Sequence, residues 1–129
     1  MTADGERESA AAELELAAEE LRAADRLAQC GFLRIALVRS YFAAFRAARA
    51  RLYADGLEPR ARAGVHHLWN VHLVKPGRYE AATSRLLSRL QKFREEADYA
   101  QAFVVDEAGA REELDAARGL VERIRRELA

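Results

Sequence analysis

The most constraining feature of this chain of 129 residues is a long segment that is apolar around most of a helix. It reads FLRIALVRSYFAAFRAARARLY, residues 32–53, and it consists largely of good helix formers. As an α-helix it would be about 33 Å long, at ~1.5 Å per residue. A helix that is apolar on most sides is buried among several neighbours or against a second subunit. The segment therefore predicts a central helix surrounded by others.

Helical periodicity recurs along the rest of the chain, and no segment shows the sustained alternation of apolar and polar residues that marks a strand. Gly31 is suited to end the first helix, and Asp106 is suited to cap the last. We expect residues 1–8 to be flexible and residues 1–129 to form a single domain. The predicted fold class is all-α, an antiparallel helical bundle of four to five helices. Besides the central one, helices are predicted over about residues 7–29, 64–74, 79–97 and 107–128.

Charge and cysteine content narrow the class of protein. The 21 basic residues balance the 21 acidic ones, but 20 of the basic residues follow the acidic first 20 positions, so the remainder is net basic. That distribution is a mild indication of an anionic partner. A single cysteine, Cys30, excludes a disulfide within the chain and favours a reducing compartment. No apolar run is long enough for a membrane span and no signal peptide is evident, so we expect a cytoplasmic protein without a membrane partner.

Three histidines lie close together in the sequence, at His66, His67 and His72. A helical zinc motif needs two histidines four residues apart and a third ligand. The spacings here are one, five and six residues, and no acid or cysteine lies among them. We therefore predict no metal site and no cofactor.

Polar residues gather near the end of LQKFREEADYAQAF, residues 90–103. Arg94 and Asp98 are four residues apart, so they share one face of a helix and can form an ion pair. Tyr99 joins them only where the helix ends or unwinds. Three interpretations remain open: a solvated helix end, a structural latch that closes the helix, or a site in which Asp98 orients the Arg94 guanidinium toward a phosphate.

The central segment carries polar residues of its own, Arg39 and Ser40, beside Tyr41. Polar groups in an apolar helix are costly unless they are hydrogen-bonded or line a cleft. For Arg39 and Ser40, a core hydrogen bond and a part in a site both remain open as alternatives. Tyr41 is more typical of a core residue. The site hypothesis places Arg39, Ser40 and Tyr41 on the second-helix side of a cleft that faces Arg94.

Three motifs together resemble a known family. They are VRSYFAAFRAARARLY in the central segment, GVHHLWNVHLVKPGRY after the following loop, and LSRLQKFREEADYAQAF at the end of the next helix. This succession resembles the small single-domain HEPN proteins. Their members show an Arg-x-Tyr/Phe-Tyr/Phe-Ala-x-Phe helix, a Phe-Val-Lys-x-Gly segment and an Arg-x-x-Ala-Asp-Tyr helix end. The resemblance covers about residues 12–128.

The resemblance implies a helical bundle that forms a homodimer through its longest helices. Many HEPN proteins are metal-independent ribonucleases, and others are toxins paired with a small nucleotidyltransferase antitoxin of the MNT type. In the ribonucleases an arginine holds the scissile phosphate in a bidentate manner. A histidine shortly after it moves a proton near neutral pH and activates the ribose 2′-hydroxyl.

At the corresponding place this chain has Arg94 followed by Tyr99, so a tyrosine replaces the expected catalytic histidine. The resemblance assigns the phosphate to Arg94, with Asp98 or Tyr99 assisting. A tyrosine is protonated at neutral pH and is a poor general base. Tyr99 is also a candidate acceptor for nucleotide transfer by a partner enzyme, while the modified tyrosine of related toxins corresponds to Gln101 here.

Two hypotheses of function follow. The first is a toxin-like HEPN protein that acts on RNA, as a metal-independent ribonuclease or as the toxin of a pair with a nucleotidyltransferase. The second is a non-catalytic dimeric module that binds such a nucleotidyltransferase. A further arginine–histidine pair, Arg62 and His67, has the ribonuclease spacing but lies outside the matching helix end, and we treat it as accidental.

Overall fold

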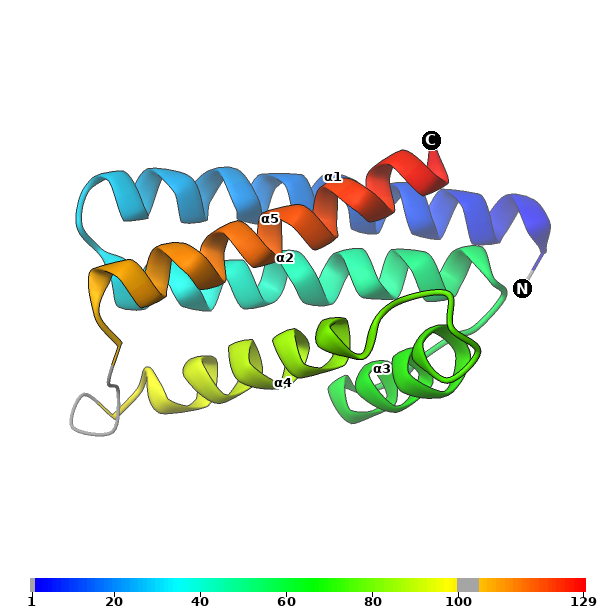
Figure 1. The fold of residues 1–129 in the computed structure, drawn as a ribbon. Coiled ribbons are helices and arrows are strands. Elements are labelled where there is room, and N and C mark those ends of the chain that lie inside the picture. Colours follow the sequence, from blue (N-terminus) through cyan, green and yellow to red (C-terminus); the bar gives the residue numbers. More distant parts are fainter. Residues whose placement is uncertain (1, 100–104) are drawn as a thin grey trace.

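The computed structural model describes residues 2–99 and 105–129, and within these residues the chain forms helices and no strand. The helices pack into one bundle, so the predicted all-α class is confirmed (Figure 1). In chain order they are α1 (Ala3–Gln29), α2 (Leu33–Ala54), α3 (Arg62–Trp69), the π-helical turn η1 (Asn70–Val74), α4 (Ala81–Glu96) and α5 (Glu107–Leu128).

The first helix begins earlier than predicted, at Ala3 instead of residue 7, so positions expected to be flexible are helical. Thr2 explains the early start, because its hydroxyl oxygen accepts a hydrogen bond from the Gly5 N–H at 3.0 Å. Acidic residues in the first turn also interact favourably with the helix dipole. At the other end, Gly31 has a φ of 86°, a left-handed conformation that suits glycine and ends the helix as predicted.

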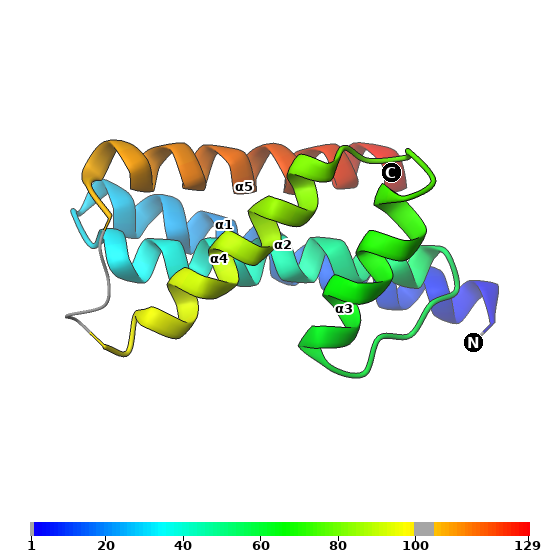
Figure 2. The ribbon, with the colours of Figure 1, turned by 60° about the horizontal axis from the view of Figure 1, so that its bottom comes forward.

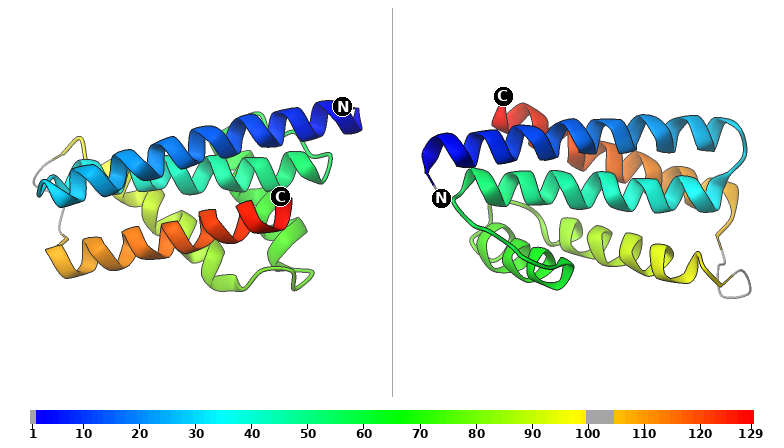
Figure 3. Two further views of the ribbon diagram at one scale, coloured as in Figure 1. Left: turned by 90° about the horizontal axis from the view of Figure 1, so that it is seen from above. Right: turned by 180° about the vertical axis from the view of Figure 1, so that it is seen from behind.

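The second helix lies at the centre of the bundle, in contact with α1, α3, α4 and α5. Views from above and from behind show that α1 runs antiparallel to α2 along its whole length, while α5 runs in the same direction as α2 (Figure 3). This central position accounts for the apolar circumference of the segment. Near its start, however, large apolar side chains remain exposed, with Phe32 56% and Ile35 40% accessible.

Alanines supply much of the buried surface of α1 and α2. Their short side chains let helix backbones approach closely and lose no rotamer freedom on folding. The alanines of these two helices that are completely shielded from solvent are Ala17 and Ala24 on α1 and Ala43, Ala44, Ala47, Ala48 and Ala50 on α2.

The fourth helix crosses α2 obliquely, and the shorter α3 lies beside it over the same side of α2 (Figure 2). Trp69 at the end of α3 holds this part together. Its side chain is fully buried, its indole N–H donates to the Thr83 hydroxyl at 2.9 Å, and its ring meets Tyr79 edge-on at 4.7 Å between centroids. These contacts fix α3 against the start of α4.

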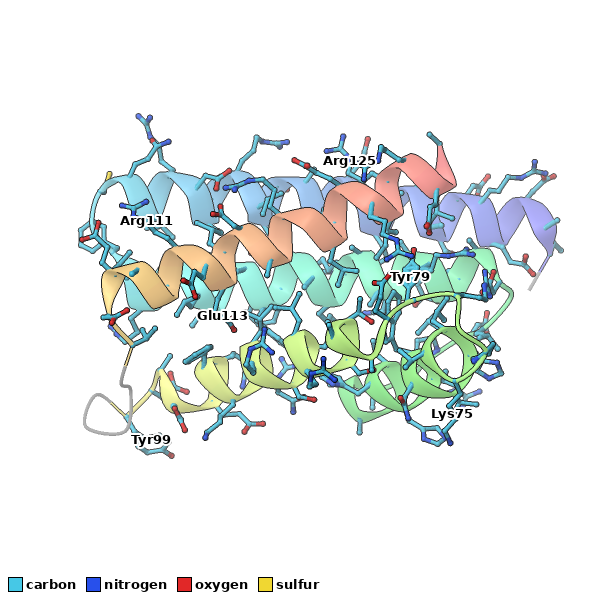
Figure 4. All side chains as sticks on the ribbon, viewed as in Figure 1. Lys75, Tyr79, Tyr99, Arg111, Glu113 and Arg125 are labelled. Atoms are coloured by element: carbon cyan, nitrogen blue, oxygen red, sulfur yellow. The ribbon has the colours of Figure 1, made fainter. Side chains whose placement is uncertain are left out.

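Tyr79 connects the same region to the last helix. Its hydroxyl donates a hydrogen bond to the Glu127 carboxylate, and the Arg123 guanidinium lies 4.0 Å from the centre of its ring. Burial, followed by the bond to Glu127, raises the pKa of the Tyr79 hydroxyl far above its ordinary value. In Figure 4 the labelled Tyr79 extends from the loop before α4 toward α5.

The last helix begins as predicted, because the Asp106 carboxylate caps it and accepts a hydrogen bond from the Gly109 N–H at 2.6 Å. Residues at helical spacing face the core, since Leu114, Ala117, Val121 and Ile124 are buried, and Leu128 is partly buried. Over the ranges that the structure describes, no helix combines the length and apolar character that a membrane span requires.

Candidate functional site

Three arginines from three different helices converge on one aromatic ring. The guanidinium carbons of Arg39 on α2, Arg62 on α3 and Arg94 on α4 lie 4.9, 5.6 and 5.8 Å from the centre of the Phe42 ring. We call these four residues the Phe42 cluster. Each cation is attracted to the ring, by about 0.5–1 kcal/mol at an exposed site. The three positive charges repel one another, so an anion bound among them would be stabilised.

The carboxylates of the bundle leave most of this charge uncompensated. Glu20 on α1 pairs with Arg39, which donates to its two oxygens at 3.1 and 3.2 Å. Arg62 and Arg94 form no ion pair and no hydrogen bond with any residue in 2–99 or 105–129. Their N–H groups are therefore available to a ligand. Guanidinium groups in this state are suited to bidentate recognition of a phosphate.

Tyr41 lies directly beneath the cluster. Its side chain is completely buried, and its hydroxyl finds no hydrogen-bond partner within the described part of the chain. Burial raises the pKa of this hydroxyl, while the charges of Arg62 and Arg94 oppose the rise. The Tyr41 ring lies 5.3 Å from the Phe42 ring, centre to centre, which places it beside the cluster.

The predicted α2 side of the site needs correction. Ser40 is fully buried and its hydroxyl donates to the Ala36 carbonyl at 2.9 Å, which is the core hydrogen bond of the two alternatives. Tyr41 is likewise a core residue. Only Arg39 reaches the surface, because it lies on the same helical face as Phe42 whereas Ser40 and Tyr41 point inward. The exposed face of α2 continues instead through Phe42 and Arg46.

The predicted polar cluster at the end of α4 forms only in part. Arg94 is half-buried and joins Phe42, but Asp98 and Tyr99 are exposed, and no Arg94–Asp98 ion pair is present within the described residues. The reason is that α4 ends at Glu96 and the buried Ala97 turns the chain outward, with its carbonyl held by Arg34 at 2.7 Å.

Tyr99 projects from the end of α4 away from the bundle and is 68% exposed (Figure 4). Tyr99 was predicted to join Arg94 in one polar cluster, and the structure does not bring them together. Gln101, the position that corresponds to the modified tyrosine of related toxins, lies outside the described residues.

His66 is a neighbour of the cluster that the sequence analysis missed. It follows Arg62 by one turn of α3, is half-buried, and its Nε2 atom is shielded and without a partner in the ranges described. Burial lowers its pKa, and the charge of Glu95 on α4 opposes this effect. The helical spacing of Arg62 and His66 was the available signal. His67, which has the ribonuclease spacing from Arg62, is exposed.

The three histidines do not form a metal centre with other side chains. Nowhere in residues 2–99 and 105–129 are three or more His, Cys, Asp or Glu side chains grouped so that they could hold a metal ion. The groups gathered at and around the Phe42 cluster are guanidinium groups, an aromatic face, the Tyr41 hydroxyl and the His66 imidazole.

Comparison with known proteins defines the class to which this fold belongs. The family model described as the HEPN domain matches residues 10–127, nearly the whole chain. The chain therefore belongs to the HEPN family.

Two relatives are similar over part of the chain. One is "Putative toxin MJ0605" of Methanocaldococcus jannaschii, 34% identical over 93 residues, which are 72% of this chain and 69% of the relative. The other is "UPF0332 protein PH1297" of Pyrococcus horikoshii, 33% identical over 75 residues, which are 58% of this chain and 53% of the relative.

Proposed function

We propose that this chain is a toxin-like HEPN protein that acts on RNA in the cytoplasm and cleaves it without a metal ion. One observation carries the proposal: Arg62 and Arg94, two guanidinium groups without a carboxylate partner among the described residues, converge with Arg39 on the Phe42 ring. An aromatic face surrounded by arginines is a common platform for single-stranded RNA, because bases stack on the ring and phosphates bind the arginines. Membership of the HEPN family and the name of the toxin relative support the same class.

The proposed reaction is attack of a ribose 2′-oxygen on the neighbouring phosphorus. A bond forms between the 2′-oxygen and phosphorus, the bond from phosphorus to the 5′-oxygen breaks, and the products end in a 2′,3′-cyclic phosphate and a 5′-hydroxyl. Arg94 and Arg62 stabilise the negative charge that develops on the phosphate oxygens.

Proton transfer is assigned to the exposed end of α4. We assign the acceptance of the 2′-hydroxyl proton to Asp98, the exposed carboxylate that follows the end of α4, four residues after Arg94. The departing 5′-oxygen takes a proton from water. His66 is an unsuitable base in this arrangement, since its Nε2 atom is shielded from solvent.

Cleavage of a structured RNA by the purified protein in the presence of EDTA tests the proposal. We expect fragments that carry a 2′,3′-cyclic phosphate. A phosphatase removes this phosphate only after the ring has been opened, and gel electrophoresis before and after treatment detects the difference. Chelation should leave the rate unchanged, because no metal takes part in the reaction. Intact RNA after incubation with folded protein would contradict the ribonuclease proposal and favour the second hypothesis.

The second hypothesis is a non-catalytic dimeric module that binds a nucleotidyltransferase of the MNT type. The observation that favours it is the exposure of large apolar side chains, since Leu16 and Ile35 are each 40% and Phe32 56% accessible. Exposed apolar surface of this kind is characteristic of protein interfaces. Tyr99, at 68% exposure, is accessible for nucleotide transfer by such a partner.

Both hypotheses include a homodimer, and this can be measured directly. We expect light scattering at micromolar concentration to give twice the mass of 14.5 kDa that one chain has. Replacing Phe32 and Ile35 with serine should shift the protein toward the monomer, because the change removes apolar surface from the start of α2. A monomeric mass for the unaltered protein would contradict the prediction.

A further inference from the structure

A second group of arginines lies next to the Phe42 cluster, around a pocket between α2 and the loop that leads into α3. The pocket encloses about 300 Å³. This volume is at the lower end of the range for small-ligand sites, which suits one nucleotide unit rather than several. Its lining includes Phe42, Arg46 and Arg49 from α2, and Arg60, Ala61 and Arg62 from the loop and the start of α3.

The charge of this pocket is strongly positive and weakly compensated. Among its four arginines, Arg46 pairs with Glu13, at 3.3 Å. Arg49 donates to the Tyr53 hydroxyl at 2.6 Å, and its buried Nε has no partner in the part of the chain described. Arg60 and Arg62 are exposed and likewise form no ion pair or hydrogen bond within residues 2–99 and 105–129. Three of the four guanidinium groups thus lack a carboxylate.

The start of α3 adds further donors to the same pocket. Ala61 is the N-cap residue of α3, and its methyl side chain cannot accept the hydrogen bonds that a capping oxygen would accept. The N–H groups of the first turn are therefore open to an acceptor, and the helix dipole favours a negative charge there. Since Ala61 and Arg62 line the pocket, these donors and the arginines serve the same space.

From this arrangement we infer that the pocket binds the terminal phosphate of an RNA chain. A terminal phosphomonoester carries close to two negative charges at neutral pH and three oxygens that accept hydrogen bonds, as a phosphorylated side chain does. An internal phosphodiester carries one charge, so it uses fewer of these donors. Because Phe42 and Arg62 belong both to the pocket and to the Phe42 cluster, an RNA held by its end would place its next nucleotides across that cluster.

This inference rests on the proposed action on RNA and adds an end-specific contact to it. The end in question is a 5′-phosphate or a 3′-phosphate, which present the same chemical group. The 5′-hydroxyl fragment that the proposed cleavage releases lacks the group, so the pocket would distinguish an intact 5′-phosphorylated RNA from that fragment.

A binding experiment can separate this inference from the cleavage reaction. Short single-stranded RNAs with 2′-O-methyl riboses cannot be cut by a 2′-hydroxyl, so their binding is independent of catalysis. Three such RNAs of one sequence, ending in a 5′-phosphate, a 3′-phosphate or hydroxyls alone, would be titrated by fluorescence anisotropy. We expect a phosphorylated end to tighten binding by about tenfold, and the two phosphorylated RNAs identify which end is used.

Substitutions test whether the tighter binding of the phosphorylated end arises in this pocket. Replacing Arg60 and Arg62 together with glutamine should abolish the advantage of the phosphorylated end, and Arg60→Gln alone should reduce it. Both residues are exposed, so the fold should persist, and circular dichroism checks this. The matched control is Arg126→Gln, which removes an exposed arginine of α5 from outside the pocket and should keep the full advantage.

Three outcomes would overturn the inference. They are equal affinity for all three RNAs, failure of all three to bind, and an advantage of the phosphorylated end that survives the double substitution. If the phosphorylated end gives its advantage in this assay but unmodified RNA stays intact in the cleavage assay, the ribonuclease proposal is overturned and the pocket remains assigned.

Discussion

Replacing Arg94 with alanine is expected to lower the rate of RNA cleavage by about two orders of magnitude or more, because a preorganised donor to the transition state is lost. Arg94 is half-buried against Phe42, and in the described residues its guanidinium serves no carboxylate. Its removal should therefore affect the reaction far more than the fold. The rate is measured with a labelled structured RNA under single-turnover conditions, and the melting temperature is recorded in parallel.

Two further variants make this prediction specific. Arg94→Lys keeps the charge but loses the bidentate geometry, so it should recover only part of the rate. Arg85→Ala removes an exposed arginine from the same helix and should leave the rate unchanged. Equal losses in Arg85→Ala and Arg94→Ala would mean that only the general positive charge of α4 matters. An undiminished rate in Arg94→Ala would remove Arg94 from the reaction.

The largest expected effect on stability is that of Trp69→Ala. Trp69 is fully buried between α3 and α4, where it bonds to Thr83 and packs against Tyr79. Truncating a buried tryptophan to alanine typically costs about 3–5 kcal/mol. A domain of this size has about 5–15 kcal/mol in total, so the loss is a large share of its stability. Urea denaturation followed by circular dichroism gives the free energy of unfolding.

The contribution of packing can be separated from that of the hydrogen bond. Thr83→Val removes the acceptor while keeping the shape, which leaves the buried indole N–H unpaired and should cost about 1–3 kcal/mol. Trp69→Phe keeps much of the packing, so it should fall between Thr83→Val and Trp69→Ala. A loss below about 1 kcal/mol in Trp69→Ala would mean that α3 is not held by this residue.

The helices could be predicted because their signals are local. Gly31 ends the first helix and Asp106 caps the last, and each acts within a few residues of itself. The early start at Ala3 was missed because a single Thr2 cap outweighs the polar composition that follows it. The burial of α2 was evident from its composition, but the neighbours that cover it were not.

The candidate site was harder to predict because it is made of residues that are distant in sequence. Arg94 lies over the ring of Phe42 on α2, where Arg62 from α3 also lies, and it forms no ion pair with Asp98 among the described residues. The ion pair with Asp98 was inferred from helical spacing, which holds only while the helix continues. Because α4 ends at Glu96, the rule no longer applies at Asp98.

The completely buried alanines of α1 and α2 limit how this sequence can drift in evolution. At such positions any larger side chain must displace a neighbouring backbone, at a typical cost of about 1–3 kcal/mol, whereas glycine loosens the helix by roughly 1 kcal/mol. Neither direction of change is neutral at Ala43, Ala44, Ala47 or Ala48. The arginines interspersed among them, Arg39, Arg46 and Arg49, lie on the outer face and are free of that restriction. Related proteins can therefore change their ligand by substituting these arginines, while the buried alanines of the same helix stay nearly unchanged.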